Sequence, residues 1–220
     1  MIDYELLQSA LINLLKDIEF STTGAITISA VNQSFIRSSG SFVDDRFYAG
    51  MEVTGTGLGD AANEAASVIE EVTDTTLTVD RALITEAAGA GKTLSLLLPS
   101  KRGWENVKLD PQSGYPYIEE EMVPGPATHA TVGNPGWEDF FPLWTIRVSV
   151  PIEVGSSCLN RYSDGILGLF PPNLAGTLST GDTWRVRTDP APFREQSVNI
   201  RKGWITAPVT IPIWLRTYNS

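Results

Sequence analysis

The chain has little of the chemistry on which most enzymes depend. Among its 220 residues there is one histidine, His129, and one cysteine, Cys158. A single cysteine excludes an intrachain disulfide, and one histidine with one cysteine is too few for a zinc site. A catalytic pair would require both side chains to meet in space, and we expect instead a solvated loop histidine and a small packed cysteine. The sequence therefore predicts no cofactor and no metal, and it argues against an enzyme.

Signals for export and for membranes are absent as well. No apolar run reaches the roughly 18 residues that a membrane span needs. The start, MIDYELL, lacks the basic flank and apolar stretch of a secretory signal. We therefore expect a protein that is made in the cytoplasm and acts without classical secretion or membrane insertion.

Positive charge is scarce. The formal net charge is −10, from 26 acidic and 16 basic residues. A free protein of this sign repels nucleic acid. The acidity is uneven, because residues 19–100 hold 11 acidic and 4 basic residues, whereas residues 101–220 are nearly balanced. The second region can therefore pack against other proteins without strong repulsion.

A nucleotide-binding loop is suggested by Gly89-Ala90-Gly91-Lys92-Thr93 and then rejected. The phosphate-binding pattern needs a glycine at position 86 and a helix after the lysine. Position 86 is Glu86, and the following residues LSLLLPS are typical of a strand. We expect a β-turn here.

A strand followed by a helix is the clearest pattern in the chain. Apolar and polar residues alternate from Trp144 to Val150, which is typical of a strand with one buried face. Ser156 or Ser157 can cap the helix that follows, and Pro171-Pro172 ends it. The apolar helical positions are Leu159, Tyr162, Ile166 and Phe170. The helix is expected to fold back onto the strand.

The rest of the chain divides into two regions. Residues 4–17 have one apolar helical face, and residues 20–99 contain short alternating strands separated by glycine and aspartate. Further strands are expected at 104–109, 115–123, 183–188, 197–200 and 209–215. We predict an α+β domain from residues 1–19 and 100–220, mainly an antiparallel sheet packed by two helices. A small all-β barrel or sandwich, residues 20–99, is inserted into it.

Two further expectations concern prolines. Pro208 and Pro212 predict that the last strand lies at an edge or is irregular. Residues 123–137, VPGPATHATVGNPGW, predict a long mobile loop. Its candidate contact residues are Val123, Gly125, His129, Gly133 and Trp137.

Charged strand residues are the remaining candidates for function. Glu119 and Glu121 share one face of a strand, and Glu120 takes the other. Arg185 and Arg187 share the face opposite Trp184. The alternatives are plain solvation, an ion-pair face between subunits, and a basic patch for DNA, which the net charge disfavours. The candidate subunit-interface or lumen residues are Glu119, Glu120, Glu121, Arg147, Arg185 and Arg187.

Residues 1–18 and 101–220 resemble the tail terminator proteins of long-tailed bacteriophages. The resemblance rests on the N-terminal helix, the run E-E-M-V-P-G-P at 120–126, V-x-V-P at 148–151, Phe170-Pro171, and Gly203 to Ile211. It implies a virion protein that forms a ring, usually of six subunits, at the head-proximal end of the tail. The ring would contact the tail tube protein and the head connector protein, and DNA would pass through it without specific binding.

Other functions stay open at this point. A tail tube, neck or stopper protein is the structural alternative. A carbohydrate-binding or surface-binding β module, with Phe42, Phe47 and Tyr48 as candidate aromatics, is the alternative of another class.

Overall fold

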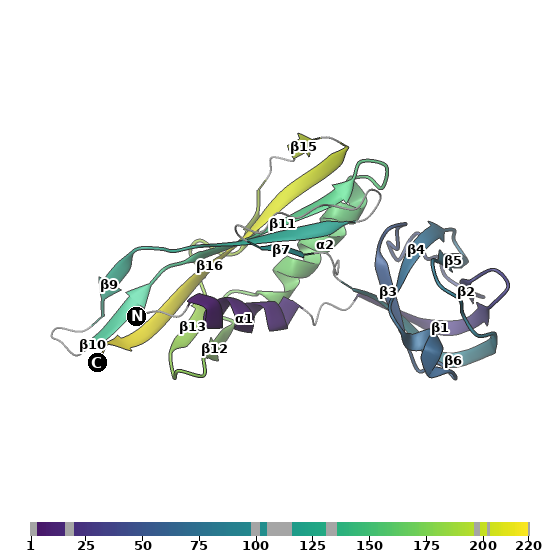
Figure 1. Cartoon of the computed structure of the whole chain (residues 1–220), viewed down its shortest axis with the longest axis horizontal. Coiled ribbons are helices and arrows are strands. Elements are labelled where there is room, and N and C mark those ends of the chain that lie inside the picture. Colours follow the sequence, from purple (N-terminus) through teal and green to yellow (C-terminus); the bar gives the residue numbers. More distant parts are fainter. Residues whose placement is uncertain are drawn as a thin grey trace.

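The computed structural model describes residues 4–15, 20–97, 102–104, 116–130, 136–195, 199–201 and 203–219. It consists of a closed barrel at one end of the long axis and a sheet with two helices that extends to the other end (Figure 1). In the described part of the chain, no helix is long and apolar enough to cross a membrane.

Residues 20–97 form the barrel, whose strand order is β1-β2-β5-β4-β3-β6. Its elements are β1 (Phe20–Ser29), β2 (Ser34–Arg37), β3 (Glu52–Thr56), the 3-10 turn η1 (Ala61–Glu64), β4 (Ser67–Val72), β5 (Thr76–Val79) and β6 (Glu86–Leu97). β6 pairs with β1 as well as with β3, which closes the barrel. The first residue of β1, Phe20, lies opposite Leu96 of β6, so the chain enters and leaves the barrel at neighbouring positions.

The barrel core explains why the short strands form. Ile26 and Ile28 of β1, Leu77 of β5 and Leu94 of β6 are buried, and polar residues alternate with them. Phe42 and Phe47 are also buried, and their rings meet edge to face at 5.5 Å. Two of the three aromatics proposed for a carbohydrate surface are therefore core residues.

The remaining strands form one ten-stranded sheet. They are β7 (Arg102–Trp104), β8 (Tyr117–Val123), β9 (Ala127–His129), β10 (Gly136–Phe140), β11 (Leu143–Pro151), β12 (Ala175–Thr177), β13 (Thr183–Val186), β14 (Phe193–Arg194), β15 (Asn199–Arg201) and β16 (Trp204–Asn219). The main order is β12-β13-β16-β11-β8-β7, and among these pairs only β7 with β8 is parallel. The predicted α+β class and antiparallel sheet fit this arrangement.

Helix α2 (Ser156–Leu169) packs on β11 and β16, and helix α1 (Tyr4–Leu15) contacts α2. Trp144 of β11 meets Phe170, directly after α2, edge to face at 5.3 Å. This confirms the predicted strand, the helix and their packing. The predicted cap is wrong: Gly155, at φ 83°, is the N-cap residue, and no side chain caps the helix. Glycine tolerates this left-handed conformation at no steric cost.

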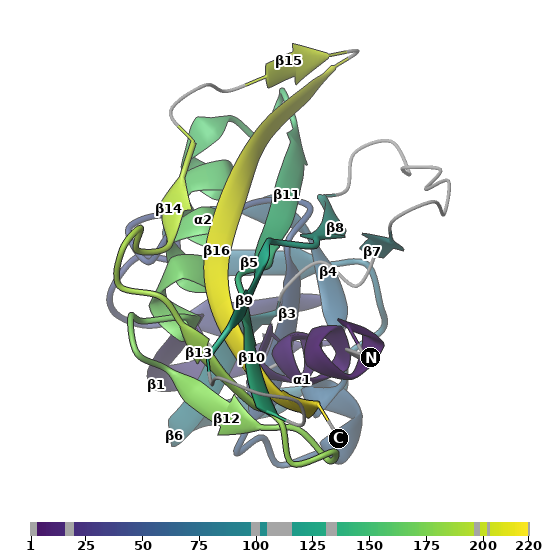
Figure 2. The ribbon, with the colours of Figure 1, turned by 90° about the vertical axis from the view of Figure 1, so that its left-hand side faces the viewer.

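The prediction of an edge position for the last strand is also wrong. β16 is the longest strand, with β11 and β10 on one side and β13, β14 and β15 on the other (Figure 2). The carbonyls of Pro208 and Pro212 accept hydrogen bonds from Glu195 and Arg187, beyond the ends of β14 and β13. A residue in an antiparallel strand directs its amide and carbonyl to the same side. Both missing amides therefore face gaps between neighbouring strands, and pairing with β11 continues unbroken.

The predicted loop at 123–137 is wrong in part: residues 124–126 are in neither helix nor strand, but strands occupy 127–129 and 136–137. Ala127–His129 forms β9, which pairs with β10; residues 131–135 lie outside the described part. All three residues of β9 are exposed. Because backbone pairing rather than burial holds β9, its sequence carries no hydrophobic alternation. Of the strand predicted at 104–109, only Trp104 is described, as the last residue of β7.

Candidate functional site

One face of the sheet is not covered by α2, and we call it the outer face. Trp144 faces the helix side, so its neighbours Thr145 and Arg147 face the opposite side. The register extends this face across the sheet: Arg147 lies opposite Glu119 of β8 and Pro208 of β16. Further along β16 it carries Trp214, Arg216 and Tyr218.

The carboxylates of β8 divide as predicted. Glu119 and Glu121 lie on the outer face, whereas Glu120 is opposite Ile146 and is 1% exposed. Arg147 donates a hydrogen bond from Nη2 to Oε2 of Glu121 and forms an ion pair with it. This ion pair lies within one chain, so it neutralises part of the acidic row.

Arginines and aromatic rings form a second cluster on the outer face. The guanidinium of Arg185 on β13 lies 5.6 Å from the ring centre of Trp214, and that of Arg216 lies 4.8 Å from the same ring. The guanidinium of Arg187 lies 5.4 Å from the ring centre of Phe141. Cations are attracted to ring faces at these distances. We call these five residues the arginine furrow.

Two hollows run along the arginine furrow, with volumes of about 250 and 390 Å³. Arg185 and Trp214 line both hollows, so they form the ridge between them. Arg187 and Phe141 lie on one side, and Arg216 lies on the other. The hollows are shallow and open, which suits contact with another surface rather than enclosure of a small molecule.

The charges of the furrow differ in how they are balanced. Arg216 donates hydrogen bonds to both carboxylate oxygens of Asp139, at 2.7 and 2.9 Å. These bonds hold the pKa of Asp139 below its ordinary value, against the opposing effect of burial. Within the described residues, no carboxylate lies within ion-pair distance of Arg185 or Arg187. Two positive charges on the outer face are therefore left unbalanced there.

The predicted contact residues of the 123–137 segment lie on the β8–β9–β10 part of the sheet. Val123 is exposed at the end of β8, and Trp137 on β10 packs edge to face on Tyr218 at 5.1 Å. Nδ1 of His129 lies 3.4 Å from Oε1 of Glu138. Gly133 lies outside the described residues.

Gly125 is the position in this segment that tolerates no side chain. A Cβ there would lie 1.8 Å from the carbonyl oxygen of Phe141 and 2.2 Å from its carbonyl carbon. Both are backbone atoms, so Gly125→Ala is expected to shift the β9–β10 hairpin and to lower the free energy of unfolding by about 1–3 kcal/mol. This change in the free energy of unfolding is measured by urea unfolding, monitored by tryptophan fluorescence.

The matched control is Gly168→Ala in α2. A Cβ at Gly168 would meet nothing within 4 Å, and alanine is favoured over glycine in a helix by about 1 kcal/mol. We expect this variant to be at least as stable as the unmodified chain. Equal stability of both variants would contradict the close approach of Gly125 to the β10–β11 connection.

The catalytic motifs considered from the sequence do not come together. Cys158 is buried in α2, and burial raises the pKa of its thiol to about 12, whereas His129 is exposed on β9. The Gly89–Thr93 run lies within β6, where the register with β1 shifts, so the predicted turn is a bulged strand. In the part of the chain described, no group of three histidine, cysteine, aspartate or glutamate side chains is placed to hold a metal.

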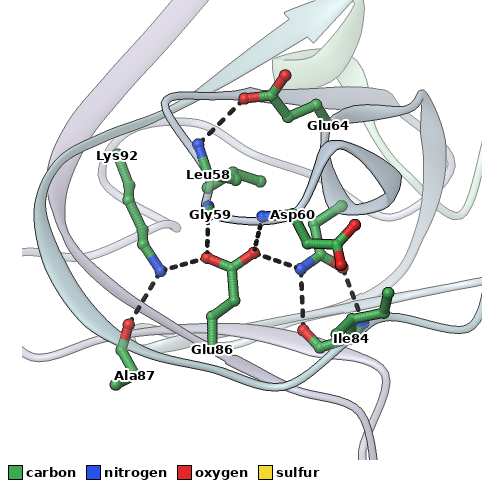
Figure 3. Close-up of polar contacts among 9 residues, drawn as sticks. Leu58, Gly59, Asp60, Glu64, Ile84, Glu86, Ala87 and Lys92 are labelled. Atoms are coloured by element: carbon green, nitrogen blue, oxygen red, sulfur yellow. Dashed lines mark hydrogen bonds and ion pairs between the residues drawn. The ribbon is translucent and has the colours of Figure 1, made fainter.

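The lysine of the rejected phosphate-binding motif has an internal partner (Figure 3). Lys92 Nζ donates a hydrogen bond to Oε2 of Glu86 at 2.8 Å, and Glu86 also accepts from Gly59 N, Asp60 N and Asn63 Nδ2. Sequence reasoning missed this network and the roles of Trp214 and Arg216. The only signal for the network was the acid at position 86, where the phosphate motif needs glycine.

Comparison with known proteins identifies one family. The model of the family described as "Phage tail terminator protein" matches residues 84–213, more than half of the chain. One solved structure, whose title states no function, is 22% identical with a TM-score of 0.44, covering 56% of this chain and 83% of that chain. No curated protein sequence matches.

Proposed function

Because this chain belongs to the phage tail terminator family, we propose that it ends the growth of a phage tail tube by forming a ring on its head-proximal end. The family assigns a structural role in the virion tail. The ring, its position and its contacts with a head connector protein are the proposal. The observation that carries it is the family match, which extends from β6 to β16.

The outer face supports an assembly role. It presents tryptophan, tyrosine and arginine side chains, the residues that contribute most often to the energy of protein interfaces. Trp137 and Tyr218 are 38% and 52% exposed although they pack on each other. A closed ring of identical subunits needs two different complementary surfaces on each copy, and the barrel and the far part of the sheet lie at opposite ends of the elongated molecule (Figure 1).

The lumen of the ring stays a prediction. Acidic side chains such as Glu119 and Glu121 would repel passing DNA and prevent it from adhering. Reversing both charges is then expected to slow DNA passage and to reduce infectivity. Unchanged infectivity would show that these residues do not line the lumen.

Light scattering combined with negative-stain images tests the proposed ring. We expect a particle of about six times the chain mass of 23.9 kDa with a central hole. Added to polymerising tail tube protein, the chain is expected to produce short tubes of uniform length with one closed end. Long tubes built from this chain itself would show a tube protein instead, and a particle that leaves tube growth unchanged would refute the terminator function.

A further inference from the structure

We propose that the exposed carboxylates Glu70 and Glu71 on the barrel of one subunit bind the arginine furrow of the next subunit. The inference rests on the proposed ring and gives the barrel a role in closing it. Its occupant is a second copy of this chain.

The furrow is built to receive carboxylates. Arg185 and Arg187 are two residues apart and lie on the same side of the sheet, each with its guanidinium over an aromatic ring. Arg187 is also held by a hydrogen bond from Nη2 to the carbonyl of Asp189 at 2.6 Å. Fixed guanidinium groups lose little conformational freedom on binding and pair with carboxylates through parallel hydrogen bonds.

The barrel supplies the matching pair of acids. Ile69 lies opposite Val79 and Glu71 lies opposite Thr78, so Glu70 is the extra residue of a β-bulge in β4. Both Glu70 and Glu71 are exposed. Two adjacent strand residues normally face opposite sides, and the bulge allows two consecutive carboxylates to reach solvent.

Within the described residues, neither Glu70 nor Glu71 forms an ion pair, and three of the four basic residues of the barrel contact other groups. Arg37 pairs with Asp45 at 2.6 Å, and Lys92 pairs with Glu86. Arg81 donates to backbone carbonyls of the η1 segment.

The two charged regions lie on different parts of an elongated molecule. The barrel occupies one end of the long axis, and β13 lies in the half of the sheet that extends toward the other end (Figure 1). Contacts between different surfaces of identical subunits are heterologous and produce rings when the rotation closes. The charge of −10 makes nucleic acid a poor occupant of the furrow, because the whole chain repels it.

Charge reversal tests the contact. One variant carries Glu70→Arg and Glu71→Arg, and the other carries Arg185→Glu and Arg187→Glu. Like charges then face each other at every contact of either variant, and we expect association to weaken more than tenfold in both. An equimolar mixture is expected to restore association as alternating rings, because each barrel then meets a furrow of opposite charge.

A matched control carries Glu153→Arg and Asp164→Arg, which change the charge equally at exposed acids of the sheet and helix part. Circular dichroism verifies that all variants fold. The control is expected to associate normally. Normal association of either reversed variant, or failure of the folded mixture to associate, overturns the proposed contact.

Cross-linking distinguishes this inference from the proposed function. Glu71→Cys and Arg185→Cys proteins are mixed and mildly oxidised, in solution and on tail tubes; native Cys158 is buried. A disulfide-linked dimer is expected, and a mixture of Glu153→Cys with Arg185→Cys is expected to give none. If the native chain forms rings that cap tubes but the cysteine mixture gives no cross-link, the contact alone is refuted. If the native chain neither forms rings nor caps tubes, the contact and the proposed function are both refuted.

Discussion

Glu86→Ala is expected to destabilise the barrel by about 3–5 kcal/mol, because it leaves the charge of a buried lysine without its partner. The Lys92 side chain is 7% exposed, and that of Glu86 is 12% exposed. The same substitution removes the acceptor for the amides of Gly59 and Asp60 and for the side chain of Asn63. The η1 segment therefore loses its attachment to β6.

The effect can be assigned to the barrel by comparing two signals. All six tryptophans follow residue 100, so none lies in the barrel. We expect far-UV circular dichroism to show early unfolding in urea, whereas tryptophan fluorescence changes near its original midpoint. Glu71→Ala, at an exposed acid of the barrel, is the control and is expected to change the free energy of unfolding by less than about 0.5 kcal/mol. A Glu86→Ala variant as stable as this control would contradict the network.

The same network predicts a dependence on pH. Burial alone would raise the pKa of Glu86, but the hydrogen bonds from Lys92, Gly59, Asn63 and Asp60 outweigh it and lower the pKa from 4.5 to about 2. A carboxyl whose pKa is lower in the folded state stabilises that state above its unfolded pKa. This contribution is expected to be lost between about pH 4.5 and pH 2. In Glu86→Gln, the loss of stability between about pH 4.5 and pH 2 is expected to become smaller, as measured by urea unfolding at several pH values. An unchanged dependence of stability on pH would show that other carboxyl groups cause this loss.

Trp144→Ala is expected to lower the stability of the sheet by about 3–5 kcal/mol, through the lost burial and the cavity that remains. Trp144 is fully buried between β11 and α2, and it contacts Phe170. Thr145→Ala, at the next position of the same strand, changes an outer-face side chain and is the control. The other five tryptophans report the unfolding of the sheet by fluorescence. The urea midpoint of the barrel, followed by circular dichroism, is expected to shift less than the midpoint of the sheet.

A double-mutant cycle separates the ring contact from general packing. Phe170→Ala and Trp144→Ala are combined, and the coupling energy is expected to be about 0.5–1.5 kcal/mol, as for other edge-to-face aromatic pairs. Additive effects would mean that the two rings contribute through burial alone.

The spacing of apolar residues in the sequence predicted the elements that bury one regular face. The alternation around Trp144 and the helical spacing of Leu159, Tyr162 and Ile166 predicted β11, α2 and their packing, which the structure confirms. Local rules failed where distant partners decide the outcome. Pro212 lies in a central strand because the neighbouring strand ends there, and no local pattern carries that information.

The candidate site was predictable only in part. Its charged residues stand out by alternation, so Arg185 and Arg187 were correctly expected on the face opposite Trp184. Their aromatic partners Trp214 and Phe141 come from segments that are remote in sequence. Register across β16 brings them together, and a single sequence does not specify which strands pair.

The pairing of Phe20 with Leu96 has a genetic consequence. Because the barrel begins and ends at adjacent positions of β1 and β6, the two ends of this polypeptide segment meet in space. A recombination event that inserts or removes this segment has to rejoin the chain at one place only, and the gap left behind is narrow enough for a few residues to bridge. The geometry therefore permits related genomes to gain, lose or exchange the barrel as a cassette while the reading frame of the sheet is retained.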